Sequence, residues 1–84
     1  MKLIFADEAW EDYLYWQKQD KRMVERINTL IRETQREPFT GVGKPEALKH
    51  ALSGYWSRRI TDEHRMVYRI EDSALLIAQL RFHY

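Results

Sequence analysis

The stretch 54–84 constrains the fold more than any other part of this chain. It contains three short runs in which apolar and polar side chains alternate, near 55–60, 65–70 and 76–83. Because successive side chains of a β-strand point to opposite faces, this alternation predicts three consecutive strands. We expect these strands to form one antiparallel sheet.

The alternation divides the predicted strands into an apolar face and a charged face. The apolar face would carry Trp56, Ile60, Met66, Tyr68, Ile70, Leu76, Ala78, Leu80 and Phe82. The charged face would carry Tyr55, Ser57, Arg59, Arg65, Val67, Arg69, Ile77, Gln79, Arg81 and His83. Arg58 breaks the pattern, because alternation puts it on the apolar side. We expect it at a sheet edge, or with its guanidinium extended into water.

The same pattern sets the register between neighbouring strands. Directly paired residues on adjacent strands share a face. Arg59 and Arg65 can therefore share a face only if the loop between their strands has an odd number of residues. This predicts a three- or five-residue loop around 61–63, and we expect the same parity around 71–73.

The first half of the chain predicts one strand and two helices. Residues 2–5 form an apolar run that could add a strand to the sheet. Asp7 and Asp20 are suitable N-caps for a first and a second helix. The second helix carries an apolar stripe at three- and four-residue spacing, formed by Met23, Val24, Ile27, Leu30, Ile31 and Thr34. Pro38 should end it, because proline disfavours helical backbone in the preceding residue.

A loop and a helical turn complete the predicted order. Residues 38–45 are rich in proline and glycine and predict a loop. Residues 46–50 predict a single helical turn, which would put Glu46 and Lys49 on one face. The predicted fold class is α+β, a single domain spanning 1–84. Two N-terminal helices would pack on one face of a twisted antiparallel sheet in the order β-α-α-β-β-β, and the other face would stay open.

Composition excludes several kinds of site and location. The chain has no cysteine, so it can form neither a disulfide framework nor a thiolate metal site. No apolar run approaches the roughly 20 residues of a membrane span, and the first residues lack the shape of a signal peptide. These features predict a cytoplasmic protein without a membrane partner. The net charge of +1 suggests no partner by itself.

The charged face brings together the residue types that cleavage of RNA needs. Glu46 could act as a base and His83 as an acid, and two arginines on adjacent strands could flank one phosphate. In cleavage through the RNA's own 2′-hydroxyl, cations also stabilise the charge that develops on phosphorus. This chemistry requires no metal and no cofactor. In a plainer interpretation, the arginines only keep an exposed strand face soluble and His83 belongs to a frayed terminus.

Several motifs of unlike chemistry resemble the YoeB toxins of the RelE-like superfamily. The similar segments are 12–16 (DYLYW), 20–22 (DKR), 44–50 (KPEALKH), 52–68 (LSGYWSRRITDEHRMVY) and 81–84 (RFHY). The likeness covers the whole chain without an insertion. It implies a RelE-like fold, which agrees with the predicted order of elements, and the toxin half of a bacterial type II toxin–antitoxin pair.

The resemblance also implies an activity and assigns roles by position. Such toxins enter the ribosomal A site and cut messenger RNA during translation, which makes them endoribonucleases. Glu46 would be the general base, His83 the general acid, and Arg65 would stabilise the phosphorane-like transition state. Supporting contacts to the phosphate or to neighbouring groups would come from Lys49, Arg59 and Tyr84.

The resemblance further implies partners. These are an antitoxin of the YefM kind with a disordered tail that folds along the toxin, the ribosome with its messenger RNA, and a second copy of the chain in a homodimer. Three alternatives stay open. ParE-like toxins share the fold and inhibit gyrase, but they lack the set of Glu46, Arg65 and His83. The other two are a non-catalytic RNA- or antitoxin-binding module and an RNase that cuts free RNA without ribosomes.

Overall fold

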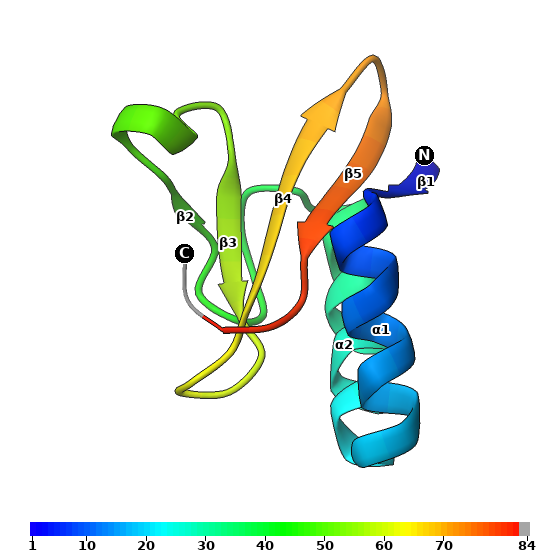
Figure 1. The fold of residues 1–84 in the computed structure, drawn as a ribbon. Helices are drawn as coiled ribbons and strands as arrows, with labels where there is room; N and C mark the ends of the chain where they lie inside the picture. Colours follow the sequence, from blue (N-terminus) through cyan, green and yellow to red (C-terminus); the bar gives the residue numbers. More distant parts are fainter. Residues whose placement is uncertain (83–84) are drawn as a thin grey trace.

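The structure is a computed structural model, and it describes residues 1–82. Its elements are β1 (Lys2–Phe5), α1 (Asp7–Gln19), α2 (Lys21–Arg36), β2 (Glu46–Ala47), a 3-10 helix (His50–Leu52), β3 (Trp56–Arg59), β4 (Arg65–Glu71) and β5 (Ala74–Gln79). The strands form one five-stranded sheet in the order β1-β5-β4-β3-β2 (Figure 1). The predicted α+β class with two N-terminal helices is confirmed.

The sheet is mixed rather than wholly antiparallel. The pairs β2–β3, β3–β4 and β4–β5 are antiparallel, whereas β1 runs parallel to β5 at one edge. The predicted strand at residues 2–5 is therefore confirmed, but its expected direction is wrong. The two helices and three further strands separate β1 from β5 along the chain, so no hairpin forces these two strands to be antiparallel.

The two helices form as their sequence patterns predict. The stripe on α2 is buried at Met23, Ile27, Leu30, Ile31 and Thr34. The Asp20 carboxylate accepts a hydrogen bond from the Arg22 amide at 3.0 Å, which confirms it as the N-cap of α2. Asp7 is instead the first residue of α1, because Ala6 occupies the cap position without a side-chain hydrogen bond.

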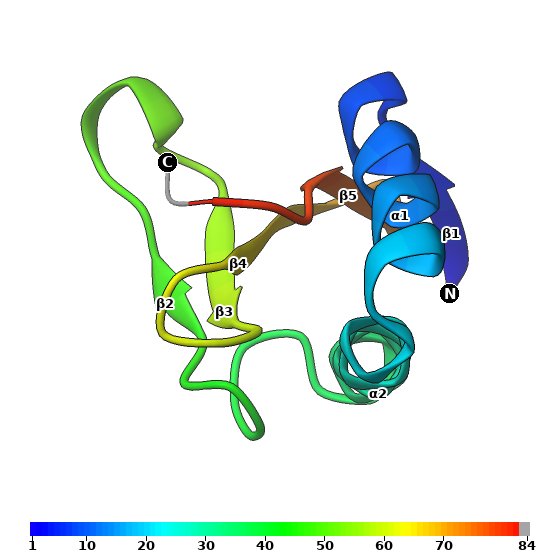
Figure 2. The ribbon, with the colours of Figure 1, turned by 60° about the horizontal axis from the view of Figure 1, so that its bottom comes forward.

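The core lies between the helices and one face of the sheet. Its buried residues are Ala9, Trp16, Met23, Ile27, Leu30, Ile31, Ile60, Met66, Tyr68, Leu75, Ile77 and Leu80. Figure 2 shows both helices on this side, with α1 next to β5 and β1. The predicted helix-covered face is therefore confirmed. The opposite face is less open than expected, because Ser57 and Val67 on it are buried, whereas Arg59 and Arg65 are partly exposed.

The register between β3 and β4 follows the predicted parity, whereas that between β4 and β5 does not. Arg59 pairs with Arg65, across a five-residue loop. In contrast, Glu71 pairs with Ala74 across a two-residue turn. Asp72 at the turn has a φ of 49°, as the tight hairpin turns that match the twist of the strands require.

A β-bulge compensates for this short turn. Because of the even turn, Leu75 and Ile77 of β5 lie in the core beside Ile70 and Tyr68, and the predicted apolar position Leu76 lies on the other face. The register then shifts between Val67 and Tyr68 of β4. One extra residue on the β5 side reverses the face to which the following side chains point. Leu80 is therefore still buried in the core, as predicted.

Arg58 is buried, which corrects the expectation of an edge or water-exposed position. Its side chain lies on the helix-covered face, and the residue is 0% exposed. The guanidinium donates to the carbonyl oxygens of Glu37, Thr40 and Val42, and to the Tyr68 hydroxyl. The charged group is tolerated there because backbone carbonyls of the loop after α2 replace its water.

Tyr68 and Gly43 complete this buried network. The Tyr68 hydroxyl donates to the Pro38 carbonyl at 2.7 Å. Burial raises the pKa of this phenol above its ordinary value of 10.0, and the hydrogen bond and charge of Arg58 oppose the shift. Gly43 has a φ of 84°, and a Cβ there would lie 2.9 Å from Leu30. Only glycine therefore lets the loop lie this close to α2.

The predicted helical turn at 46–50 is wrong. Glu46 and Ala47 form the short strand β2, and the Leu48 amide continues the pairing to the Tyr55 carbonyl at 2.9 Å. The exposed edge of β3 offers backbone partners to this segment, and those bonds override a weak local helical preference. The 3-10 helix forms only afterwards, at His50–Leu52.

Candidate active site

Strand pairing places Glu46 on the same face of the sheet as the arginines Arg59 and Arg65. Glu46 of β2 pairs with Ser57 of β3, which pairs with Val67 of β4. Directly paired residues share a face, and residues two apart on one strand do as well. Glu46 therefore shares the face of Arg59, and Arg59 pairs directly with Arg65. The predicted common face of the two arginines is confirmed, and Glu46 joins them as a strand residue.

The two arginines present unused hydrogen-bonding groups. The buried Nε atoms of Arg59 and Arg65 have no hydrogen-bond partner among the described residues 1–82. A carboxylate oxygen of the exposed Asp62 lies 3.8 Å from the Arg59 guanidinium, a distance at which an exposed ion pair contributes little. Both side chains are partly exposed. Such a pair is suited to an anionic group that arrives from solution, such as a phosphate.

Lys49 adds a further cation beside Glu46. Both side chains are exposed, and they line one shallow hollow that extends from β2 to the start of the 3-10 helix, formed by Glu46, Ala47, Leu48, Lys49 and His50. The helical turn that was expected to put the two residues on one face is absent, and the shared hollow is what brings them together.

Arg81 does not join the charged face, which corrects the alternation-based assignment. Strand β5 ends at Gln79, so alternation no longer applies at residue 81. The Arg81 guanidinium instead lies over the Tyr15 ring of α1, with 3.5 Å between the guanidinium carbon and the ring centroid. This cation–π contact packs the arginine against α1.

The chain leaves β5 and passes next to the charged face. In Figures 1 and 2 the segment after β5 crosses beside the start of β4 towards β2 and β3. The Arg65 amide donates to the Phe82 carbonyl at 3.1 Å. His83 and Tyr84, the predicted acid and one predicted binding residue, lie outside the described residues.

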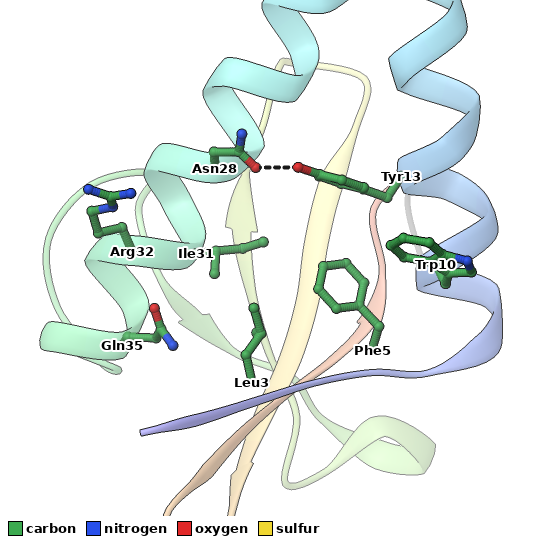
Figure 3. Close-up of a pocket in the computed structure, with 8 residues that line it drawn as sticks. All are labelled: Leu3, Phe5, Trp10, Tyr13, Asn28, Ile31, Arg32 and Gln35. Atoms are coloured by element: carbon green, nitrogen blue, oxygen red, sulfur yellow. Dashed lines mark hydrogen bonds between the residues drawn. The ribbon is translucent and has the colours of Figure 1, made fainter.

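A second hollow lies on the helix-bearing side of the molecule, away from this face. Figure 3 shows it between β1, α1 and α2, where the Tyr13 hydroxyl donates to the Asn28 amide oxygen at 2.7 Å. Its lining is Leu3, Phe5, Trp10, Tyr13, Asn28, Ile31, Arg32 and Gln35. This mostly apolar lining includes no carboxylate and no histidine, so it lacks the acid and base that the charged face offers.

Comparison with known proteins identifies the family. A model for the YoeB-like toxin of bacterial type II toxin–antitoxin systems matches residues 5–84. Toxin YoeB of Escherichia coli strain K12 is 64% identical to the chain and covers 100% of both sequences. The chain belongs to the YoeB-like toxins of type II toxin–antitoxin systems.

Solved structures of YoeB proteins share the fold. A YoeB/ParE toxin from Agrobacterium tumefaciens is 57% identical, covers 100% of both chains and superposes with a TM-score of 0.98. A YoeB–YefM complex and a YoeB dimer, both from Staphylococcus aureus, are each 46% identical. They cover 100% of this chain and 98% of theirs, with TM-scores of 0.92 and 0.93.

Neither described helix is long and apolar enough to cross a membrane. Within residues 1–82, no cluster of three or more His, Asp or Glu side chains could hold a metal ion.

Sequence reasoning missed the residues that hold the segment after β5. Asp12, Trp16 and His64 all contact residues 80–82. Two of the motifs that resemble the family contain them, DYLYW at 12–16 and the longer run at 52–68. Their spacing gave no sign that they meet, because contacts across more than sixty residues of sequence depend on the tertiary fold.

Proposed function

We propose that this YoeB-like toxin is a ribosome-dependent endoribonuclease that cuts messenger RNA in the ribosomal A site. The observation that carries the proposal is the shared face of Glu46, Arg59 and Arg65 on three adjacent strands. A carboxylate base beside two arginines with free donors is the arrangement that transfer of a phosphoryl group to a nearby hydroxyl requires. The family membership supports the same assignment.

The reaction uses the 2′-hydroxyl of the RNA as the nucleophile. Glu46 takes the proton of this hydroxyl, whose oxygen forms a bond to the adjacent phosphorus. The guanidinium of Arg65 stabilises the additional negative charge on the phosphate oxygens in the transition state. The bond from phosphorus to the 5′-oxygen then breaks, and His83 supplies the proton that this oxygen takes up. The products are a 2′,3′-cyclic phosphate and a free 5′-hydroxyl.

Lys49, Arg59 and Tyr84 bind the substrate around this reaction. Arg59 pairs directly with Arg65 across β3 and β4, so it can contact an oxygen of the same phosphate. Lys49 lines the hollow next to Glu46, where it can contact a neighbouring phosphate. Tyr84 follows the predicted acid in sequence and orders the groups around it.

The ribosome supplies the substrate in the geometry that the small site needs. Glu46 and Lys49 are exposed and Arg59 and Arg65 are partly exposed, so this surface by itself does not hold a flexible RNA strand with its 2′-hydroxyl in line with the leaving 5′-oxygen. Messenger RNA fixed in the decoding site arrives with that geometry already restricted, which lowers the entropic part of the barrier. This accounts for cleavage during translation rather than in free RNA.

The proposed protein partners follow from the relatives. The solved Staphylococcus aureus structures are a YoeB–YefM complex and a YoeB dimer. We propose that this chain likewise binds an antitoxin of the YefM kind and forms a homodimer. An antitoxin tail that is disordered when free can cover a shallow charged face as it folds. The toxin acts in the cytoplasm, where ribosomes are.

The test is a cleavage assay on a defined messenger RNA, with and without ribosomes stalled on it. The cut positions are mapped by primer extension. Glu46→Ala and His83→Ala proteins are run beside the wild type, and Lys18→Ala on the exposed surface of α1 serves as the matched control. Cuts that need ribosomes, disappear in both site variants and persist in the control are expected.

Other outcomes would replace the proposal with a specific alternative. Cuts of free RNA would identify an RNase that needs no ribosome. RNA or antitoxin binding without any cut would identify a non-catalytic module, and the family fold would then serve a different function.

A further inference from the structure

The segment that leads to His83 is held by side chains that the proposed reaction does not use. The Asp12 carboxylate of α1 accepts a hydrogen bond from the Leu80 amide at 3.0 Å. The Trp16 indole donates to the Leu80 carbonyl at 2.9 Å, in the buried interior. Two residues later, the Phe82 amide donates to Nδ1 of His64 at 2.8 Å. Leu80 and Phe82 are therefore both fixed by side chains from distant parts of the chain.

His64 lies where these contacts converge. Its ring packs edge-on against Trp16, with 4.9 Å between the ring centroids, and its other side contacts the Phe82 ring at 5.5 Å. Only 12% of its side chain is exposed. Because Nδ1 accepts a hydrogen bond from an amide, this nitrogen carries no proton in the observed arrangement. Nε2 lies 3.8 Å from a carboxylate oxygen of the exposed Glu63.

Phe82 adopts a backbone conformation that needs such support. Its φ is 61°, in the left-handed region that bulky residues rarely occupy. Its side chain is 53% exposed, so burial of the ring contributes little to holding it. Its backbone is held by two hydrogen bonds, from its amide to His64 and from the Arg65 amide to its carbonyl, and its ring contacts the Arg81 guanidinium and the His64 ring.

We propose that His64 is a positioning residue for His83. It holds Phe82, the residue before His83 in the sequence, in the left-handed conformation. The Phe82 carbonyl, which belongs to the following peptide group, accepts a hydrogen bond from the Arg65 amide, so the residue before the proposed acid is tied to the residue that stabilises the transition state. This role rests on the proposed function, since His83 is the acid only if the protein cuts RNA.

Two variants separate the hydrogen bond of His64 from its packing. His64→Phe keeps an aromatic ring between Trp16 and Phe82 but has no acceptor. His64→Asn loses the ring but places its amide oxygen close to the position of Nδ1. Glu63→Gln is the matched control, because it neutralises the neighbouring charge near Nε2 and leaves the Nδ1 bond intact. Thermal unfolding of each variant establishes that it is folded.

The experiment measures kcat and KM for cleavage on stalled ribosomes, together with hydrogen exchange of the Phe82 amide. For His64→Phe we expect kcat to fall about ten- to a hundredfold, as misplacement of a catalytic group does, while KM stays close to that of the wild type. Its Phe82 amide should exchange faster. His64→Asn should have a kcat and a protection of the Phe82 amide much closer to those of the wild type than His64→Phe has. Glu63→Gln should match the wild type.

The failure of this inference is distinguishable from the failure of the proposed function. If the wild type cuts and His64→Phe cuts equally fast with an equally protected Phe82 amide, His64 has no positioning role and the proposed function stands. A fall in kcat that His64→Asn does not recover at all would assign the effect to ring packing and also overturn the inference. A wild type that cuts nothing overturns both proposals.

Discussion

Arg58 and Arg59 are neighbours in sequence, but β3 places them on opposite faces with opposite surroundings. Arg58 is fully buried, and its donors are used by three loop carbonyls and the Tyr68 hydroxyl. Arg59 and its strand partner Arg65 keep buried Nε atoms without a partner in the described residues. An arginine whose buried guanidinium is bonded to loop carbonyls holds the fold, whereas a pair of partly exposed arginines with few partners can bind a ligand.

The largest effect in this comparison should come from Arg58→Ala. It leaves several buried carbonyls and the Tyr68 hydroxyl without their donor, so we expect the free energy of unfolding to fall by about 3–5 kcal/mol. Urea denaturation followed by circular dichroism measures this. A variant as stable as the wild type would mean that water or a rearranged loop replaces the guanidinium.

Arg65→Ala should show the reverse behaviour. Its side chain makes no hydrogen bond at Nε among residues 1–82, so we expect the urea midpoint to stay close to that of the wild type. Cleavage on stalled ribosomes should slow by about 10²–10³-fold, the usual cost of losing one group that stabilises transition-state charge. Arg69→Ala, on the same strand, where the half-exposed guanidinium pairs with Glu71, is the control. An Arg65→Ala protein that unfolds would contradict the assignment of Arg65 to the open face.

The smallest effect should come from the Tyr68 phenol at alkaline pH. Because burial raises its pKa in the folded protein above 10.0, folding favours the neutral phenol. Its contribution to stability is complete below about pH 10 and is lost as pH rises through the folded-state pKa. Unfolding measured from pH 8 to 11 should show this loss. Tyr68→Phe should be less stable than the wild type by about 1 kcal/mol at neutral pH, and its stability should fall less between pH 8 and 11. If the stability of the wild type and of the variant fell equally over this range, the effect assigned to the Tyr68 phenol would be contradicted.

The shared face of Arg59 and Arg65 could be predicted because it depends only on alternation and loop parity, and both are visible in the sequence. The turn at 72–73 could not, because it places Asp72 and Ser73 at positive φ, where glycine or asparagine would be expected. The bulge in β4–β5 leaves no signature in composition either, and without it Leu80 would not be buried.

Glu46 and Arg58 show how tertiary contacts override local signals. Local spacing placed Glu46 on a helical turn, but the free edge of β3 pairs with it as a strand. Alternation correctly placed Arg58 on the apolar side. Its burial there depends on carbonyls of the loop 37–42, which pattern reasoning cannot position. The residues of the candidate site could be identified from their types and from the family resemblance. Their geometry depends on the pairing of β2, β3 and β4, which the alternation of apolar and polar residues predicts only in part.

The measurement that tests the central claim most directly uses an RNA with one altered atom. A messenger RNA is stalled on the ribosome with a 2′-deoxynucleotide at the mapped cut position, and its cleavage is compared with that of the unmodified RNA. If the charged face activates the 2′-hydroxyl, the cut at that position should disappear, and the unmodified RNA should yield a 2′,3′-cyclic phosphate. Equal cleavage of both RNAs would mean that the nucleophile comes from elsewhere, and it would contradict the roles proposed for Glu46 and His83.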